Sequence, residues 1–146
     1  MYNADGDPEE LSDPAGNTTY TYDALNRLTE EIQGNGPSAT YGYDEASNLT
    51  TFYDAGGTTV YLYNGLNQLE AMHEPTGSCT GTPSKCTHFA YENGTLDKVT
   101  YPSGATLNYT LEAATKRPTA STVKNPAGET LLTNTYSYEH KPPTRR

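Results

Sequence analysis

The sequence contains no tryptophan and only two phenylalanines, and its hydrophobic residues make up 33% of the chain. So small an apolar share excludes a thick core between two packed layers. No apolar run approaches the ~18 residues that a membrane-spanning helix needs, so we expect no membrane insertion. Residues 1–7 lack the basic and apolar regions of a signal peptide. Together with the repeats described below, this predicts an internal piece of a longer chain.

Basic residues are scarce in the first half of the chain. Residues 1–74 hold 13 acidic side chains and one base, Arg27, whereas residues 75–146 hold 5 acids and 8 bases. The net charge of -9 argues against nucleic acid as a partner, because phosphate binding requires clustered Lys and Arg. Two interpretations of the acidic half stay open: ordinary solubilisation of exposed strands, or an acidic face that steers partners.

Tyrosine, threonine, glycine and proline are abundant instead. The chain has 13 Tyr, 13 Gly and 10 Pro. Tyrosine and threonine favour half-buried pleated strands, while glycine and proline favour turns. Disordered segments are poor in aromatic and β-branched residues, so this composition indicates an ordered, β-rich protein.

One motif recurs along the chain: Tyr-x-Tyr-Asp, then an Asn and a Leu. It occupies residues 20–29, 41–50 and 61–69, and the first tyrosines are 21 and then 20 residues apart. Weaker copies begin at Phe89, Leu107 and Tyr136. Alternation at period two places both tyrosines of a pair on one face of a strand. The residues that define the repeat are Tyr20, Tyr22, Asp23, Tyr41, Tyr43, Asp44, Tyr61, Tyr63, Tyr91, Tyr136 and Tyr138.

A second motif, an Asp-Pro-Ala-Gly turn and its variants, lies between these copies. Proline presets the first central position of a tight turn, and glycine supplies a positive φ. Each unit of ~20 residues therefore holds two short strands and two turns. We predict one array over residues 1–146 with about six degenerate repeats, interrupted by longer loops at 74–88 and 112–135. Because one hairpin cannot bury its tyrosine face, the fold must be stabilised by stacking of neighbours.

These residues resemble the YD repeats of the RHS family, named for the Tyr-Asp pairs seen at residues 22–23, 43–44 and 53–54. The family pattern of a glycine turn, Thr-Thr, aromatic-x-Tyr-Asp and Asn-Arg-Leu is matched best over residues 16–29. The resemblance implies an all-β fold of antiparallel hairpins stacked into a curved open sheet. In that family the sheet forms a hollow shell around a C-terminal toxin, so this chain resembles a strip of the wall.

The resemblance implies a non-catalytic structural segment of an exported bacterial polymorphic toxin or of a secreted or cell-surface protein. The implied partners are neighbouring repeats of the same or a longer chain and an enclosed toxin domain. An alternative stays open: an adhesin-like module whose tyrosine-rich face binds carbohydrate or a partner protein, because tyrosine rings suit both. The family's self-cleavage sequence is Asp-Pro-x-Gly-Leu; Asp13 begins a similar sequence that ends at Asn17 and recurs as a plain turn, so no protease role is transferred to it.

Two cysteines, Cys79 and Cys86, fall in the first of the longer loops. Six intervening residues that include Gly and Pro permit a turn within disulfide range. A disulfide is favoured, and free thiols or a metal site are the alternatives; zinc would need further ligands, and His73 and His88 are the histidines nearby.

No catalytic constellation is present in the sequence. His73, His88 and His140 stand in no known catalytic motif, and no phosphate-binding or dinucleotide-binding fingerprint occurs. The carboxylates Asp23 and Asp44 occupy repeat-equivalent turn positions, whereas catalysis needs a unique arrangement. We therefore expect no enzymatic activity, no metal site and no cofactor.

Overall fold

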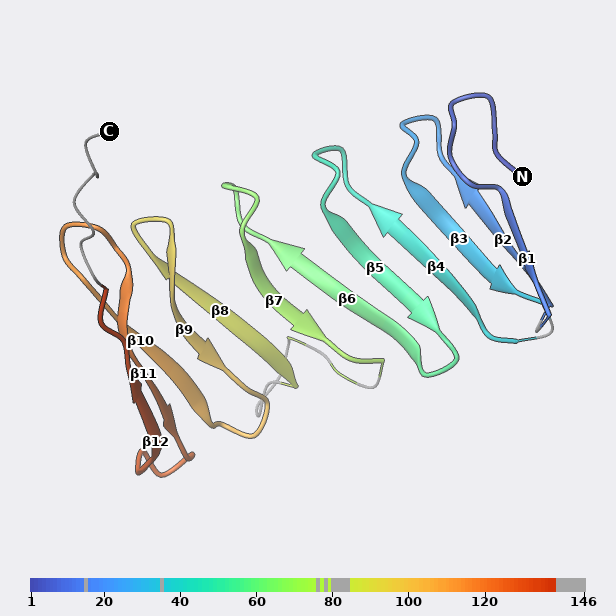
Figure 1. The fold of residues 1–146 in the computed structure, drawn as a ribbon. Coiled ribbons are helices and arrows are strands. Elements are labelled where there is room, and N and C mark those ends of the chain that lie inside the picture. The colour runs from blue at the N-terminus through green and yellow to red at the C-terminus, as the bar shows by residue number, and fades with distance from the viewer. Residues whose placement is uncertain (15, 35, 76, 78, 80–84, 139–146) are drawn as a thin grey trace, which may run out of the picture. The chain divides into compact units, whose positions relative to one another are not determined.

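The structure, a computed structural model, describes residues 1–14, 16–34, 36–75, 77, 79 and 85–138. Within these ranges the secondary structure consists of twelve β-strands and turns, without a helix (Figure 1), so the prediction of an all-β antiparallel fold is confirmed. None of the described residues form a helix that is long and apolar enough to cross a membrane. The chain divides into two compact units, Met1–Cys86 and Thr87–Arg146.

The first unit is a series of antiparallel strands in which each strand pairs with the next along the chain. Short hairpin connections are the reason, because they bring consecutive strands side by side. The strands are β1 (Glu10–Asp13), β2 (Gly16–Tyr22), β3 (Leu28–Gln33), β4 (Ser38–Tyr43), β5 (Leu49–Asp54), β6 (Gly57–Tyr63) and β7 (Leu69–His73).

The second unit repeats this plan. Its strands also pair in chain order and antiparallel. They are β8 (Cys86–Glu92), which begins at the boundary, β9 (Thr95–Thr100), β10 (Thr106–Leu111), β11 (Pro118–Lys124) and β12 (Thr130–Thr135).

The tyrosine pairs occupy the ends of strands β2, β4 and β6, where the alternation of a strand directs both side chains of a pair to one face. In the β4–β5 hairpin, Tyr41 lies opposite Phe52 and Tyr43 lies opposite Leu49. The rings of Tyr41 and Phe52 are 5.3 Å apart, a favourable spacing for aromatic rings. An irregularity in register precedes the second tyrosine of every pair in the first unit. Such bulges add one residue to one strand and re-aim the side chains that follow.

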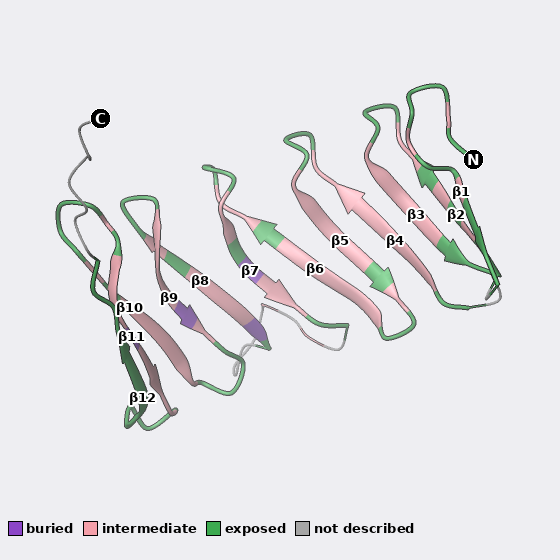
Figure 2. Ribbon diagram, viewed as in Figure 1, coloured by how far each residue is buried: buried purple, intermediate pink, exposed green. Residues whose placement is uncertain are grey.

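Burial is shallow throughout the described part of the chain (Figure 2). Ala71, Cys86, Val99 and Ser121 are the residues classed as buried there, and most other strand residues are half-buried. A sheet of one layer covers its side chains with lateral neighbours alone, which agrees with the expectation that no thick core forms.

The predicted loop at 112–135 is wrong. Strands β11 and β12 lie in it. Its alternating Thr, Ser and Val residues suit a strand, but residues 112–135 contain no tyrosine that would reveal it. The predicted loop at 74–88 is shorter, because β8 begins at Cys86; residues 76, 78 and 80–84 of that loop lie outside the described residues.

The copy placed at Leu107 is displaced by one tyrosine position. The register irregularity in β10 falls between Thr110 and Leu111, and the turn begins at Glu112. Tyr109 therefore corresponds to the first tyrosine of a pair, and Leu111 takes the place of the second. The prediction failed because a leucine replaces the tyrosine that the motif requires.

At one end of the strands in each unit, the glycine of one turn lies against the proline of the next turn on that side. A Cβ atom at Gly57 would lie 2.6 Å from the Cβ of Pro75, and one at Gly104 would lie 3.3 Å from the Cβ of Pro126. Both glycines have a positive φ, +116° and +83°. The turn glycines predicted from sequence thus serve two purposes: they allow the backbone conformation and leave room for a proline in the next turn on that side.

Candidate functional site

A row of five-residue turns lies at one end of the strands of the first unit, where β2 connects to β3, β4 to β5 and β6 to β7. In the turn from Asp23 to Arg27, the Asp23 N–H donates to the Arg27 carbonyl over 2.9 Å, and the Asn26 N–H donates to the Asp23 carbonyl over 3.0 Å. The same pair of bonds closes the turns 44–48 and 64–68. The fourth residue has a positive φ in all three turns, 58° at Asn26, for example. Asparagine tolerates this conformation and occupies the position in the first and third turns, whereas Ser47 occupies it in the second.

The side chain of the first residue organises each turn from within. The Oδ1 atom of Asp23 accepts the backbone N–H groups of Leu25 and Arg27 at 2.9 and 3.0 Å. In the third turn, Oδ1 of Asn64 does the same for Leu66 and Gln68 at 2.9 and 3.1 Å. Asp and Asn share this acceptor oxygen, so either residue can begin the turn.

The first and fifth side chains of each turn form a complementary pair. Where the first residue is Asp, the fifth donates: Arg27 Nε is 2.7 Å from Asp23 Oδ2, and Asn48 Nδ2 is 2.9 Å from Asp44 Oδ2. Where the first is Asn, the fifth accepts: the Asn64 amide donates to Gln68 Oε1 over 3.1 Å. In the second unit, the turn between β11 and β12 contains the same kind of pair: the Asn125 amide donates to the Glu129 carboxylate over 2.7 Å. What recurs is therefore the hydrogen bond between the first and fifth side chains, although the residue types at both positions vary.

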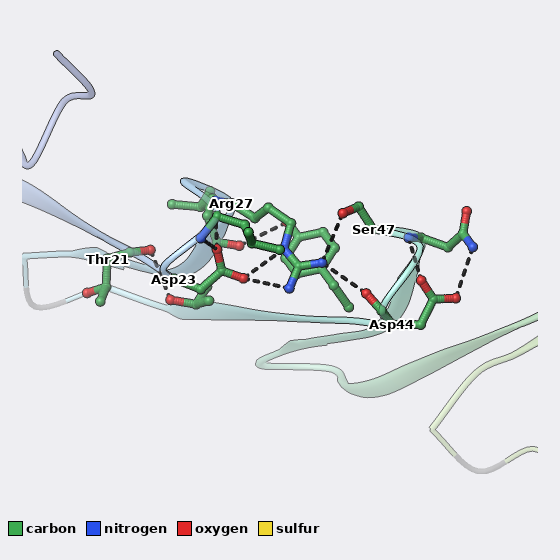
Figure 3. Close-up of polar contacts among 10 residues, drawn as sticks. Thr21, Asp23, Arg27, Asp44 and Ser47 are labelled. Atoms are coloured by element: carbon green, nitrogen blue, oxygen red, sulfur yellow. Dashed lines mark hydrogen bonds and ion pairs between the residues drawn. The ribbon is translucent and has the colours of Figure 1, made fainter. Parts of the chain in front are cut away.

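Arg27 also joins its own turn to the next one (Figure 3). Its guanidinium donates to the Asp44 carbonyl over 3.0 Å and to Ser47 Oγ over 3.2 Å. The same group forms an ion pair of 2.7 Å with Asp23 and lies 4.6 Å from the centre of the Tyr43 ring. The planar fork of an arginine suits such simultaneous contacts, which a lysine could not all make. Farther along the row, Asn48 donates to Asn67 over 3.1 Å.

Tyrosine hydroxyls form a second connection between hairpins. The hydroxyl of Tyr43 donates to the Leu28 carbonyl over 2.9 Å, and that of Tyr63 donates to the Leu49 carbonyl over 3.0 Å. Tyr138 reaches the Pro118 carbonyl over 2.7 Å in the same way. Each second tyrosine thus bonds to the hairpin before its own. A structural role for the whole set of repeat residues stays a prediction.

The electrostatics of the site follow from these contacts. Hydrogen bonds from the Arg27 backbone N–H and then its side chain lower the pKa of Asp23 below its ordinary value. The side-chain amide of Asn48, followed by its backbone N–H, lowers the pKa of Asp44. Removal from water raises the pKa values of Tyr41 and Tyr63. The carboxylates are held ionised as hydrogen-bond acceptors, and the Tyr63 hydroxyl keeps the proton that it donates to Leu49.

Sequence reasoning missed a further copy of the turn at the start of the chain. The Asn3 N–H donates to the Asp7 carbonyl over 2.9 Å, and Asn3 Oδ1 accepts from Asp5 and Asp7 at 3.0 and 2.8 Å. Tyr22 donates to the Pro8 carbonyl over 2.9 Å, as Tyr43 does to Leu28. The signal was present as Tyr-Asn-x-x-Gly-x-Pro at residues 2–8, in which every motif residue after the tyrosine is substituted.

The structure joins Cys79 and Cys86 in a disulfide, with their Cα atoms 5.1 Å apart. Cys86 is fully buried, with 1% of its surface exposed. Oxidation in the exported protein stays a prediction. Nδ1 of His73 lies 3.1 Å from the Glu74 carbonyl, and His140 lies outside the described residues. Among the described residues no three His, Cys, Asp or Glu side chains are grouped so that they could hold a metal ion.

Strands in one layer, complementary turn pairs and hydroxyl bonds between hairpins together define a tandem β-hairpin repeat protein. Residues 2–38 match the family model of the RHS Repeat. The match includes the copy at Tyr2 and the best copy of the predicted motif. The resemblance to RHS repeats is therefore confirmed.

Solved structures extend the likeness beyond those residues. TcdB2-TccC3 in its crystal structure is similar with a TM-score of 0.70 and 16% identity, over 92% of this chain and 8% of that one. The Photorhabdus luminescens Tc holotoxin pore is similar with a TM-score of 0.71 and 16% identity, over 92% of this chain and 7% of that one. The chain thus spans less than a tenth of these proteins, and at such identity the likeness shows the fold. A search of curated proteins found no match.

Proposed function

We propose that the chain is a non-catalytic strip of the wall of an RHS-repeat shell. The observation that carries the proposal is the connection between hairpins: Tyr43, Tyr63 and Arg27 each bond to a neighbouring hairpin. Side chains that are used to attach one repeat to the next build a continuous wall. The fold likeness to Tc toxin structures over 92% of the chain supports the same function.

In this proposal the two compact units are consecutive parts of one array, and the enclosed partner is a toxin domain of the same or a longer polypeptide. Location outside the cell, secreted or at the cell surface, follows from the same proposal. The recurrence of the turn chemistry in both units supports continuity: Asn125 and Glu129 pair as Asn64 and Gln68 do.

Binding of carbohydrate or protein through the tyrosine face is the alternative function. It is less well supported, because the second tyrosines donate their hydroxyls to backbone carbonyls and have less freedom to meet a ligand. One open hollow is lined by Asp13, Gly16, Asn17, Thr18, Gln33, Gly34 and Gly36, which offer no aromatic ring for stacking on a sugar. Binding of this chain to a glycan array would favour the alternative.

The test of the shell function is a chimera. The matched segment of the TcdB2-TccC3 shell is replaced by this chain, and assembly is followed by electron microscopy and by protease resistance of the shell. The described residues hold twelve antiparallel strands, an even number, so the strand that follows the segment keeps the direction that the shell requires. We expect a closed, protease-resistant particle, whereas a β-sandwich domain of equal length in the same place should disrupt it. If the chimera fails to close although the isolated chain is folded, the proposal is wrong.

A further inference from the structure

We propose that the fifth side chain of each five-residue turn determines which hairpin can follow, through the length of the fourth side chain in the next turn. At each junction between two successive turns, a long fifth side chain requires a short fourth one, and a short fifth side chain requires a long fourth one. The inference concerns the order of hairpins within this chain and holds whether or not the chain is part of a shell.

Ser47 is the observation that requires an explanation. It has a φ of 66°, in the left-handed region that serine seldom adopts. The equivalent positions in the turns on either side hold Asn26 and Asn67, with φ values of 58° and 57°. Asparagine would therefore suit the backbone at residue 47 better than serine does. Such a conformation persists where surrounding contacts determine it, so the contacts of Ser47 should show why serine occupies this position.

The contact that serine permits is the one to Arg27 (Figure 3). The guanidinium is held at three other places: an ion pair of 2.7 Å with Asp23, a hydrogen bond of 3.0 Å to the Asp44 carbonyl, and a position 4.6 Å from the centre of the Tyr43 ring. From there it reaches the Oγ atom of Ser47 over 3.2 Å. Asparagine carries its polar atoms one bond farther from Cβ, so at position 47 it would compete with the guanidinium for the same space.

The next junction has the opposite combination. Asn48 is a short fifth residue, and its amide donates both to Asp44 Oδ2 over 2.9 Å and to Asn67 Oδ1 over 3.1 Å. A serine at position 67 would carry its oxygen one bond nearer the backbone, out of hydrogen-bond range of Asn48. The first junction agrees: the turn at the start of the chain ends with the short Asp7, and the turn after it has Asn26 at its fourth position.

Matched side-chain length makes these junctions non-interchangeable. Backbone ladders alone do not discriminate between hairpins, because every strand presents the same N–H and C=O groups to its neighbour. A hairpin with asparagine at the fourth position, placed after Arg27, would displace the guanidinium from bonds to which its charge contributes. Such a penalty against the wrong neighbour is a source of specificity. The row of turns thus favours one order of hairpins over the others.

Urea unfolding of the whole chain tests the inference, with Ser47→Asn and Arg27→Asn made singly and together. In the wild-type background we expect Ser47→Asn to raise the equilibrium constant of unfolding roughly fivefold, although asparagine suits the backbone better. In the Arg27→Asn background we expect the same substitution to lower that constant roughly threefold, because the double variant reproduces the junction between Asn48 and Asn67. The effect of one substitution should therefore change sign with residue 27.

Ser47→Gly is the matched control, because glycine accepts a positive φ and leaves the guanidinium its room. It should change the equilibrium constant of unfolding less than about twofold. Hydrogen exchange at Nε of Arg27, which donates to Asp23, gives a second measurement: it should become faster in Ser47→Asn and stay unchanged in Ser47→Gly. Effects of Ser47→Asn with the same sign in both backgrounds, or equal losses in Ser47→Gly and Ser47→Asn, would overturn the inference.

Discussion

Removal of the Tyr43 hydroxyl, in Tyr43→Phe, tests whether the bonds between hairpins stabilise the fold. The hydroxyl donates to the Leu28 carbonyl over 2.9 Å, and such a bond contributes about 1 kcal/mol. In Tyr43→Ala the ring is lost as well. It lies 4.6 Å from the Arg27 guanidinium, a contact of about 0.5–1 kcal/mol, and its partial burial contributes about 1–1.5 kcal/mol. We expect Tyr43→Phe to cost about 1 kcal/mol and Tyr43→Ala about 2.5–3.5 kcal/mol.

Urea unfolding followed by circular dichroism measures both free energies, with hydrogen exchange to show that the loss falls on β3 and β4. Tyr53→Phe is the matched control, because Tyr53 exposes 48% of its surface and its change should be close to zero. A cost below about 0.3 kcal/mol for Tyr43→Phe would mean that the hydroxyl bond is no stronger than its bond to water. Equal costs for Phe and Ala would refute the role assigned to the ring.

Three further predictions concern the turns and the disulfide. Arg27→Met keeps the apolar stem over Tyr43 but removes the bonds to Asp23 and to the next turn, so it should lower the free energy of unfolding by about 1–2 kcal/mol. Arg27→Lys should restore only part of this loss. The carboxylates of Asp23 and Asp44 have lowered pKa values in the folded protein. The stability they provide is complete above the ordinary value of 3.8 and is lost as the pH falls through the lowered values; unfolding of Asp44→Asn should therefore depend less on pH in this range. The joined cysteines should resist alkylation in non-reduced exported protein, and mass spectrometry that finds two alkylated thiols would contradict this.

The sequence predicted the parts of the fold that depend on local pattern. Alternating tyrosines at residues 20–22, 41–43 and 61–63 indicated strands, and they end β2, β4 and β6. Asn26 and the turn glycines indicated positive φ, which the backbone confirms at Asn26, Gly16, Gly57, Gly104 and Gly128; Gly77 lacks it. These features were readable because period and turn chemistry act over a few neighbouring residues.

Other parts depended on chemistry that residue identity conceals. The turn at Asn3 keeps the side-chain acceptor, the positive φ at the fourth residue and the carbonyl that accepts a tyrosine hydroxyl. The residues at these positions are Asn3, Gly6 and Pro8 in place of the Asp, Asn and Leu of the motif. Strands β11 and β12 lacked the tyrosine signal, and Leu111 hid the true register of β10. The bonds from Arg27 to Asp44 and Ser47 join residues that become neighbours only after the hairpins stack, so no local pattern could have predicted them.

The backward reach of each tyrosine hydroxyl determines how such a gene can change in length. Because Tyr43 and Tyr63 find their acceptors one hairpin earlier, removal or duplication of a whole hairpin joins a donor to an equivalent acceptor. Loss of a single strand would instead reverse the chain direction and leave the hydroxyl without its carbonyl. Unequal recombination between copies can therefore shorten or lengthen the protein in steps of two strands, and each product keeps its bonds.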